Sequence, residues 1–82
     1  MTTNLSALTQ RTPHSFTTAD PTTIATWLRT AGFRDLTVRS AYELARLQLG
    51  GELVIVYHSG SLVCQGAAAD RAVQRLATCE VA

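Results

Sequence analysis

The chain has 82 residues, of which 46% are hydrophobic and 16% are charged, and its formal net charge is +1. This composition excludes a disordered chain and is typical of one small globular domain. The near-neutral charge excludes a strongly basic protein that binds polyanions by charge alone. No apolar run approaches the roughly 18 residues that a membrane span needs. The N-terminus lacks a secretion signal, so we predict a cytoplasmic protein with no membrane partner.

The chain begins with a polar segment and then becomes more apolar. Residues 1–12 are rich in Thr, Ser, Asn and Gln, which predicts a flexible N-terminal tail. Residues 13–82 are predicted to form a single α/β domain. Its first element is a short strand at His14–Thr18, because Thr and Phe both favour strands.

The next segment has the signals of a helix at both of its ends. Asp20 can cap the free backbone N–H groups, and Pro21 suits the first helical position. Gly32 can adopt the left-handed conformation that ends a helix. The loop Phe33–Ser40 then leads into extended chain. Helical spacing predicts a buried stripe on this helix, which comprises Ile24, Ala25, Trp27, Leu28 and Ala31.

Two interpretations of residues 41–49 are open. Ser40 followed by Glu43 is a capping-box pattern, and Gly50 can end a helix that starts there. Alternatively, Tyr42–Leu49 and Glu52–His58 form a hairpin turned by the Gly-Gly link between them. We favour the strand interpretation, because a two-residue Gly-Gly link between two long runs is a strong hairpin signal.

A second hairpin and a final helix complete the predicted domain. The chain turns again at Ser59 and Gly60, and Ser61–Gln65 is the last strand. Gly66 breaks this strand, and a helix follows from about Asp70. Its predicted buried stripe comprises Ala69, Ala72, Val73, Leu76 and Ala77.

Alternation along the hairpin assigns its side chains to two faces of a sheet. A bulge at Gly60 and a strict two-residue turn are both open. The two alternatives would point opposite sets of side chains of the last strand toward the helices. With the bulge, one face is small and aliphatic and suits the two helices. It comprises Ala45, Leu47, Leu49, Val54, Val56, Leu62 and Cys64.

The opposite face has no helix left to cover it. An uncovered apolar patch of several hundred Å² usually marks an interaction site, so we predict that this face is a docking surface. The predicted binding residues are Tyr42, Leu44, Arg46, Gln48, Leu53, Ile55, Tyr57, Val63 and Gln65.

The residues that could carry chemistry are few and scattered. The pairs His14 and His58, and Cys64 and Cys79, lack the spacing of a zinc site. Both cysteines are predicted to be reduced thiols, and neither has a base at recognisable spacing. We therefore predict no catalytic residues, no metal and no cofactor, and a protein that is not an enzyme.

Three stretches resemble a repeat of the TATA-binding protein family. VIVYHSGSLVCQG (54–66) followed by a helix is similar to that repeat's hairpin. ADPTTIATWLR (19–29) is similar to its first helix, and AYELARLQL (41–49) to the strand before the hairpin. The same half-domain occurs at the N-terminus of the bacterial ribonuclease HIII family. The resemblance covers residues 14–79 and implies an α+β fold, with four or five curved antiparallel strands and two helices on the convex face.

The resemblance also implies that the concave face binds the minor groove of DNA. In that family two phenylalanines per repeat wedge between base steps, and their places match Tyr57 and, less directly, Tyr42. Val63 and Gln65 match residues of the sheet floor. Ser61 stands where the family has a basic residue, which removes a phosphate contact.

These observations lead to three functional expectations. The first is a small non-enzymatic module whose exposed sheet face binds nucleic acid, as a homodimer that copies the family's two-repeat saddle. The second is a protein-binding inhibitor or adaptor that acts on a larger nucleic-acid enzyme, of the kind phages and mobile elements use against host defence. Near-neutral charge favours this second role. The third is that the open face forms only the core of a homodimer.

Overall fold

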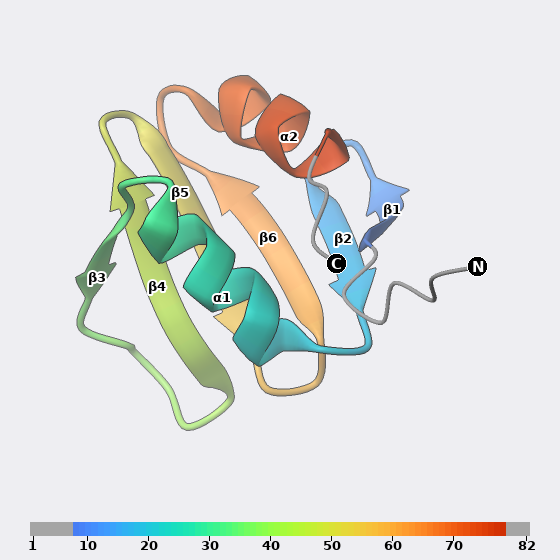
Figure 1. Cartoon of the computed structure of the whole chain (residues 1–82), viewed down its shortest axis with the longest axis vertical. Helices are drawn as coiled ribbons and strands as arrows, with labels where there is room; N and C mark the ends of the chain where they lie inside the picture. Colours follow the sequence, from blue (N-terminus) through green and yellow to red (C-terminus); the bar gives the residue numbers. More distant parts are fainter. Residues whose placement is uncertain (1–7, 79–82) are drawn as a thin grey trace.

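The computed structural model describes residues 8–78 as a six-stranded antiparallel sheet with two helices on one face (Figure 1). The elements are β1 (Leu8–Thr12), β2 (Ser15–Thr18), α1 (Pro21–Thr30), β3 (Arg34–Leu36), β4 (Glu43–Leu49), β5 (Glu52–Tyr57), β6 (Ser61–Gln65) and α2 (Ala69–Ala77). The strand order across the sheet is β1-β2-β6-β5-β4-β3. The predicted α+β class with two helices is confirmed, whereas the predicted count of four or five strands is wrong.

Both additional strands lie at the edges of the sheet. β1 falls in the predicted flexible tail, yet it pairs with β2, and Leu8 packs against the hydrophobic core. Residues 1–7 of that predicted tail lie outside the described residues. β3 falls in the predicted loop and pairs with β4. Each edge strand is short and mostly exposed, so neither has the apolar alternation that would indicate a strand in the sequence.

The helix α1 begins and ends as its capping signals predict. The backbone N–H of Thr23 donates to Asp20 Oδ1 at 3.2 Å, and the Thr23 hydroxyl donates to Oδ2 at 2.6 Å. These bonds to the ionised carboxylate lower the pKa of Asp20. Ile24, Ala25 and Leu28 from the predicted stripe are buried, which fixes this helix on the sheet.

The Gly-Gly hairpin forms in the predicted register. Residues 43–49 are a strand, so the helical interpretation of 41–49 is wrong. Ala45 pairs with Val56, and Leu47 pairs with Val54. These four side chains are buried in the core under the helices.

The conformation of Gly60 settles the register of β6. Its φ of +98° lies in the left-handed region, and its N–H donates to the carbonyl of Tyr57 at 3.0 Å. A Cβ at this position would collide with the carbonyl oxygen of Thr18. In the resulting register Val56 pairs with Leu62, as the bulged alternative predicts. The last strand therefore buries Leu62 on the side of the helices and presents its neighbours on the other side.

The helices and one face of the sheet enclose a single core. α1 packs over β4 and β5, and α2 packs over β5 and β6 (Figure 1). The fully buried side chains include Leu28 from α1, Leu47 and Val54 from the sheet, and Leu76 from α2 at 1% exposure. The predicted helix-side face is thus confirmed, and the opposite face of the sheet is free of helices.

Candidate functional site

Cross-strand pairing arranges the open face, which is the sheet surface opposite α1 and α2, in rows. In the central row Ile55 is only 1% exposed, although it does not belong to the core cluster under the helices. The side chains of its own face therefore shield it. This row crosses β3, β4, β5, β6 and β2 at Leu36, Arg46, Ile55, Val63 and Ser15. A neighbouring row runs through Arg34, Gln48, Leu53 and Gln65.

The sheet brings most of the predicted binding residues together. Because side chains alternate along each strand, they lie on the face opposite the buried residues of the core. Those brought together on the open face are Arg46, Gln48, Leu53, Ile55, Tyr57, Val63 and Gln65.

Two predicted binding residues lie elsewhere. A bulge between Glu43 and Ala45 shifts Leu44, which packs against the core cluster instead of lying on the open face. Tyr42 lies in the turn before β4 and is 79% exposed. Its N–H donates to the hydroxyl of Ser40 at 3.3 Å, so the backbone that carries this exposed ring is held in place.

The same bulge places a buried carboxylate on the open face. Glu43 pairs with Tyr57 across the strands and accepts a 2.6 Å hydrogen bond from Nε of Arg46. It also accepts longer bonds from the backbone N–H of Arg39 and the hydroxyl of Ser40, at 3.4 and 3.5 Å. The charge of Arg46 is therefore neutralised. Sequence analysis missed this pair, because regular alternation would have placed Glu43 and Arg46 on opposite faces.

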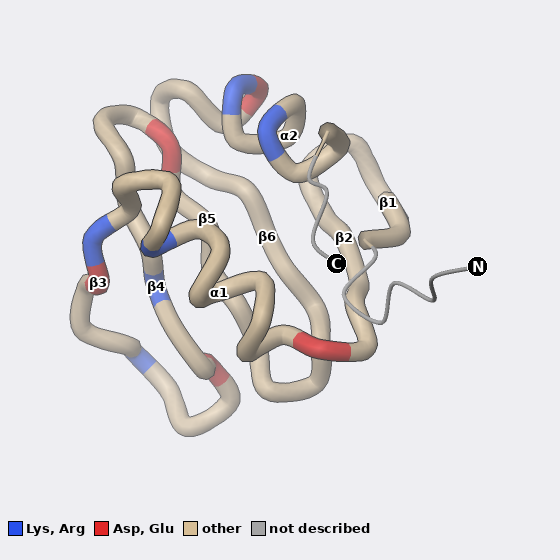
Figure 2. Tube along the Cα trace, viewed as in Figure 1, with Lys and Arg blue, Asp and Glu red and all other residues tan. Residues whose placement is uncertain are grey.

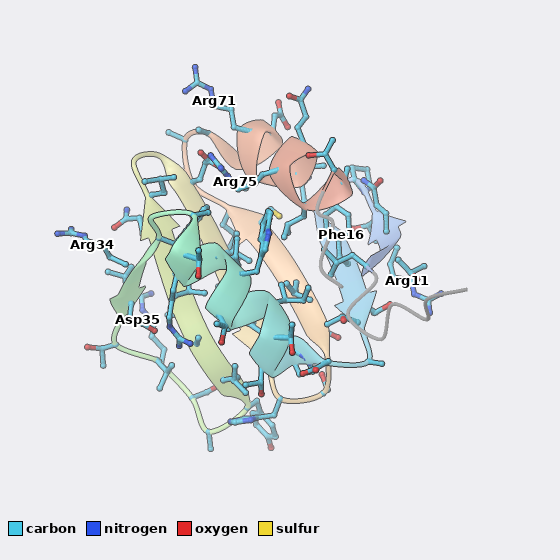
Figure 3. The ribbon with its side chains drawn as sticks, in the orientation of Figure 1. Arg11, Phe16, Arg34, Asp35, Arg71 and Arg75 are labelled. Carbon is cyan, nitrogen blue, oxygen red and sulfur yellow. The ribbon has the colours of Figure 1, made fainter. Side chains whose placement is uncertain are left out.

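Arginines without a carboxylate partner among residues 8–78 lie at both edges of this face. Arg11 on β1 donates from Nε to Oγ1 of Thr17 at 3.2 Å. Arg34 on β3 pairs with Gln48 and projects outward from the opposite edge (Figure 3). With a strand spacing of about 4.8 Å, the two edges lie roughly 24 Å apart. Sequence analysis missed both arginines, because they fall in the predicted tail and the predicted loop.

The charged residues of the helix side are paired more completely. Arg29 on α1 donates to both oxygens of Asp35 on β3, each at 2.9 Å, and this bond lowers the pKa of Asp35. Arg75 on α2 donates in the same way to Glu52 on β5. Figure 2 shows how the arginines of α2, β3 and β4 are distributed over the two layers.

Cys64 is a buried thiol on the helix side of the sheet. Burial raises the pKa of the Cys64 thiol to about 11, and the carboxylate of Glu52 adds to this shift. Cys64 is therefore a neutral, buried thiol rather than a nucleophile. Residues 8–78 contain no group of three or more His, Cys, Asp or Glu side chains that could hold a metal ion. Cys79 lies outside the described residues.

Neither helix within residues 8–78 is long and apolar enough to cross a membrane.

Comparison with known proteins finds a structural likeness. No protein-family model matches the sequence. No curated protein matches it either. The crystal structure of RNase H3 from Aquifex aeolicus is similar over 66% of this chain, with 30% sequence identity and a TM-score of 0.54. The match spans only 20% of that ribonuclease chain. It supports the resemblance to the ribonuclease HIII family over part of this chain, while the resemblance to the TATA-binding protein stays a prediction.

Proposed function

We propose that the open face of the sheet binds nucleic acid as a non-enzymatic module. The observation that carries this proposal is the arrangement of Arg11 and Arg34 at opposite edges of the open face. The centre of this face carries no net charge, because Glu43 neutralises Arg46. Phosphate groups supply most of the affinity of nucleic-acid binding, and arginine is suited to bind them in a forked geometry. The two edges can therefore hold separate segments of a sugar–phosphate backbone.

The centre of the face suits a shallow groove rather than a row of phosphates. The amides of Gln48 and Gln65 flank Leu53 and can each donate and accept hydrogen bonds. Tyr57 lies on the same face two rows further along β5, as the wedge that the TATA-binding protein resemblance implies. The minor groove of A-form helices is wide and shallow and displays 2′-hydroxyls. The similar Aquifex protein is by its name a ribonuclease. Both points favour a duplex that contains RNA over a DNA duplex.

Binding titrations with short labelled duplexes test this function. We would measure the anisotropy of an RNA duplex, an RNA–DNA hybrid, a DNA duplex and single strands at two salt concentrations. The logarithm of the affinity is expected to fall with the logarithm of the salt concentration. In Arg11→Gln and in Arg34→Gln the slope should decrease by about 1, since each removes about one phosphate contact.

Two further variants complete this test. Tyr57→Ala should weaken binding at both salt concentrations without changing the salt slope, because base or sugar stacking is lost. Arg71→Gln removes the same charge from the helix side and should leave nucleic-acid affinity unchanged. Equal affinities of the wild type, Arg11→Gln, Arg34→Gln and Tyr57→Ala would refute the proposal.

We include a homodimer in this proposal. The TATA-binding protein family, which the sequence resembles, builds its saddle from two repeats. This chain provides one sheet with two open edges. Sedimentation of the free protein over a range of concentrations measures the oligomeric state directly. If the protein is a monomer and still binds nucleic acid, the homodimer part of the proposal is refuted and the proposed binding face is retained.

A second candidate function is favoured by one apolar segment. Leu36 (37% exposed), Val38 (42%) and Tyr42 are the exposed large hydrophobic residues of the described chain. Leu36 ends β3, and the other two lie in the segment between β3 and β4. Such a cluster on a nearly neutral protein suits a protein partner, as expected for an inhibitor or adaptor of a larger nucleic-acid enzyme. Absence of nucleic-acid binding even at low salt would favour this second role.

A further inference from the structure

A hollow of about 470 Å³ lies between the two helices, on the opposite side of the molecule from the open face. Its walls come from one residue of α1, which is Trp27, and from one stripe of α2 together with the residue that follows it. Trp27 is half-buried and packs against the core cluster, so one flank of its ring is fixed. The residues that line the hollow are Trp27, Arg71, Gln74, Arg75 and Thr78.

Arg75 lines this hollow and is held in place by contacts with the sheet. Its Nε and Nη2 donate to the two carboxylate oxygens of Glu52 at 2.9 and 3.0 Å, and Glu52 is only 5% exposed. The guanidinium carbon also lies 5.3 Å from the centre of the Phe33 ring. A guanidinium has more N–H donors than these two bonds use, so Arg75 retains donors for a ligand.

Arg71 lies one turn earlier on the same stripe of α2, and its side chain extends outward from the helix (Figure 3). It has no carboxylate partner among the described residues. The first turn of a helix is the least favourable place for a positive charge, because the backbone dipole is positive there. Helix stability therefore does not explain this arginine. The exposed amide of Gln74 lies on the same side, three residues further along α2.

We propose that this hollow is a docking site for an acidic segment of a protein partner, in which a carboxylate lies next to an apolar side chain. The carboxylate would bind the guanidinium of Arg71 and the amide of Gln74, and the apolar side chain would pack on the indole of Trp27. A bidentate arginine–carboxylate pair is among the stronger polar contacts available to an interface.

Charge decides between an acidic protein and nucleic acid as the occupant. On the helix side Arg29 and Arg75 are each neutralised by a carboxylate, and Arg71 is the arginine left unpaired within residues 8–78. One unpaired arginine suffices for one carboxylate. A nucleic-acid backbone requires several phosphate contacts for comparable affinity. The hollow and the open face lie on opposite layers, so the two ligands can be bound together.

The single tryptophan of the chain makes this proposal directly testable. Trp27 lines the hollow, so its fluorescence reports on occupancy of this site. We would titrate the full chain with a short peptide in which glutamates flank a leucine, with the same peptide carrying glutamines, and with the same peptide carrying lysines. The glutamate peptide is expected to change the Trp27 emission in a saturable way, and the other two should not.

Variants of the two layers identify the contact. Arg71→Gln should weaken binding of the glutamate peptide about ten-fold, because one charge-assisted contact is lost. Arg34→Gln, which removes an arginine from the other side of the sheet, should bind the peptide as the wild type does. Thermal unfolding of each variant checks that the fold is retained. No emission change with the glutamate peptide, the same response to all three peptides, or unchanged binding by Arg71→Gln would overturn the proposal.

Discussion

The two faces of the sheet achieve burial in different ways. Under the helices, Leu47 and Val54 are fully buried by a separate layer of apolar side chains. On the open face, Ile55 is almost as completely buried, although no helix covers it. Its cross-strand neighbours are Arg46 and Val63, and the aliphatic stem of an arginine can cover apolar surface while its charged end makes a polar contact. An uncovered face can therefore be well packed and still carry polar groups for a ligand.

The distribution of ion pairs separates the two faces further. On the helix side, Arg29 and Arg75 tie the helices to carboxylates of the sheet. On the open face the one paired arginine, Arg46, lies at the centre, and the arginines without a described carboxylate partner lie at the edges. On the open face, the arginine that is paired with a carboxylate and the arginines that are not thus occupy different places. The following experiments test this division.

The largest expected difference is between two leucines of the hairpin. Leu47→Ala removes a side chain that is fully buried beneath the helices and should cost about 3 kcal/mol of the free energy of unfolding. Leu53→Ala removes the same side chain from the open face, where it is half-buried, and should cost about 1 kcal/mol. Urea denaturation measures both. Equal losses would mean that the two faces are packed alike.

Thiol reactivity distinguishes the faces in a second way. Burial raises the pKa of Cys64 to about 11 from its ordinary value of 9.0. At about pH 8 its thiolate population is then on the order of 100-fold smaller than that of an exposed cysteine. In a Cys79→Ser background, Cys64 should react with a thiol reagent only as the protein unfolds. Val63→Cys in the same background adds a thiol on the open face, and fast labelling of this thiol alone is expected.

The paired arginine of the helix side should contribute more to stability than its unpaired neighbour. Arg75→Met leaves the buried carboxylate of Glu52 without its partner and should cost about 2 kcal/mol of the free energy of unfolding. Arg71→Met, one turn earlier on the same helix, should change stability by less than about 0.5 kcal/mol. Thermal unfolding monitored by circular dichroism compares the two variants. A larger loss from Arg71→Met would show that the free arginine has a structural role.

The smallest expected effect is the acid sensitivity of the helix side. The bond from Arg29 lowers the pKa of Asp35 below its ordinary value of 3.8. The stability from this pair is therefore fully present above about pH 3.8 and is lost as pH falls through the lower folded value. Asp35→Asn should reduce the stability measured at neutral pH slightly and flatten its decline at acidic pH. An unchanged decline would show that other carboxylates control acid unfolding.

Local signals determined how much of the fold the sequence could predict. The caps of α1 and the Gly-Gly hairpin depend on neighbouring residues, and both formed as predicted. The turn at Gly60 was ambiguous, because its conformation depends on contact with Thr18, which is distant in the sequence. β1 was missed for a similar reason: its pairing with β2 fixes a polar segment that has little strand pattern of its own.

The candidate site shows the same limit. Its central residues follow from regular alternation along β4, β5 and β6, and most of them lie where the sequence predicts. The bulge beside Glu43 breaks this alternation, which moved Leu44 to the core and brought Glu43 to Arg46. The edge arginines could not be predicted without the edge strands that carry them. Whether this face binds nucleic acid stays a prediction.

The number of residues in the tight turn at Gly60 determines which side chains of β6 face the helices. Removing one residue there would turn β6 over, so Gln65 would face the helices while Leu62 and Cys64 entered solvent. Removing or adding residues in pairs would keep each side chain on its own face. A redesigned tight turn at this position should therefore retain the glycine that contacts Thr18.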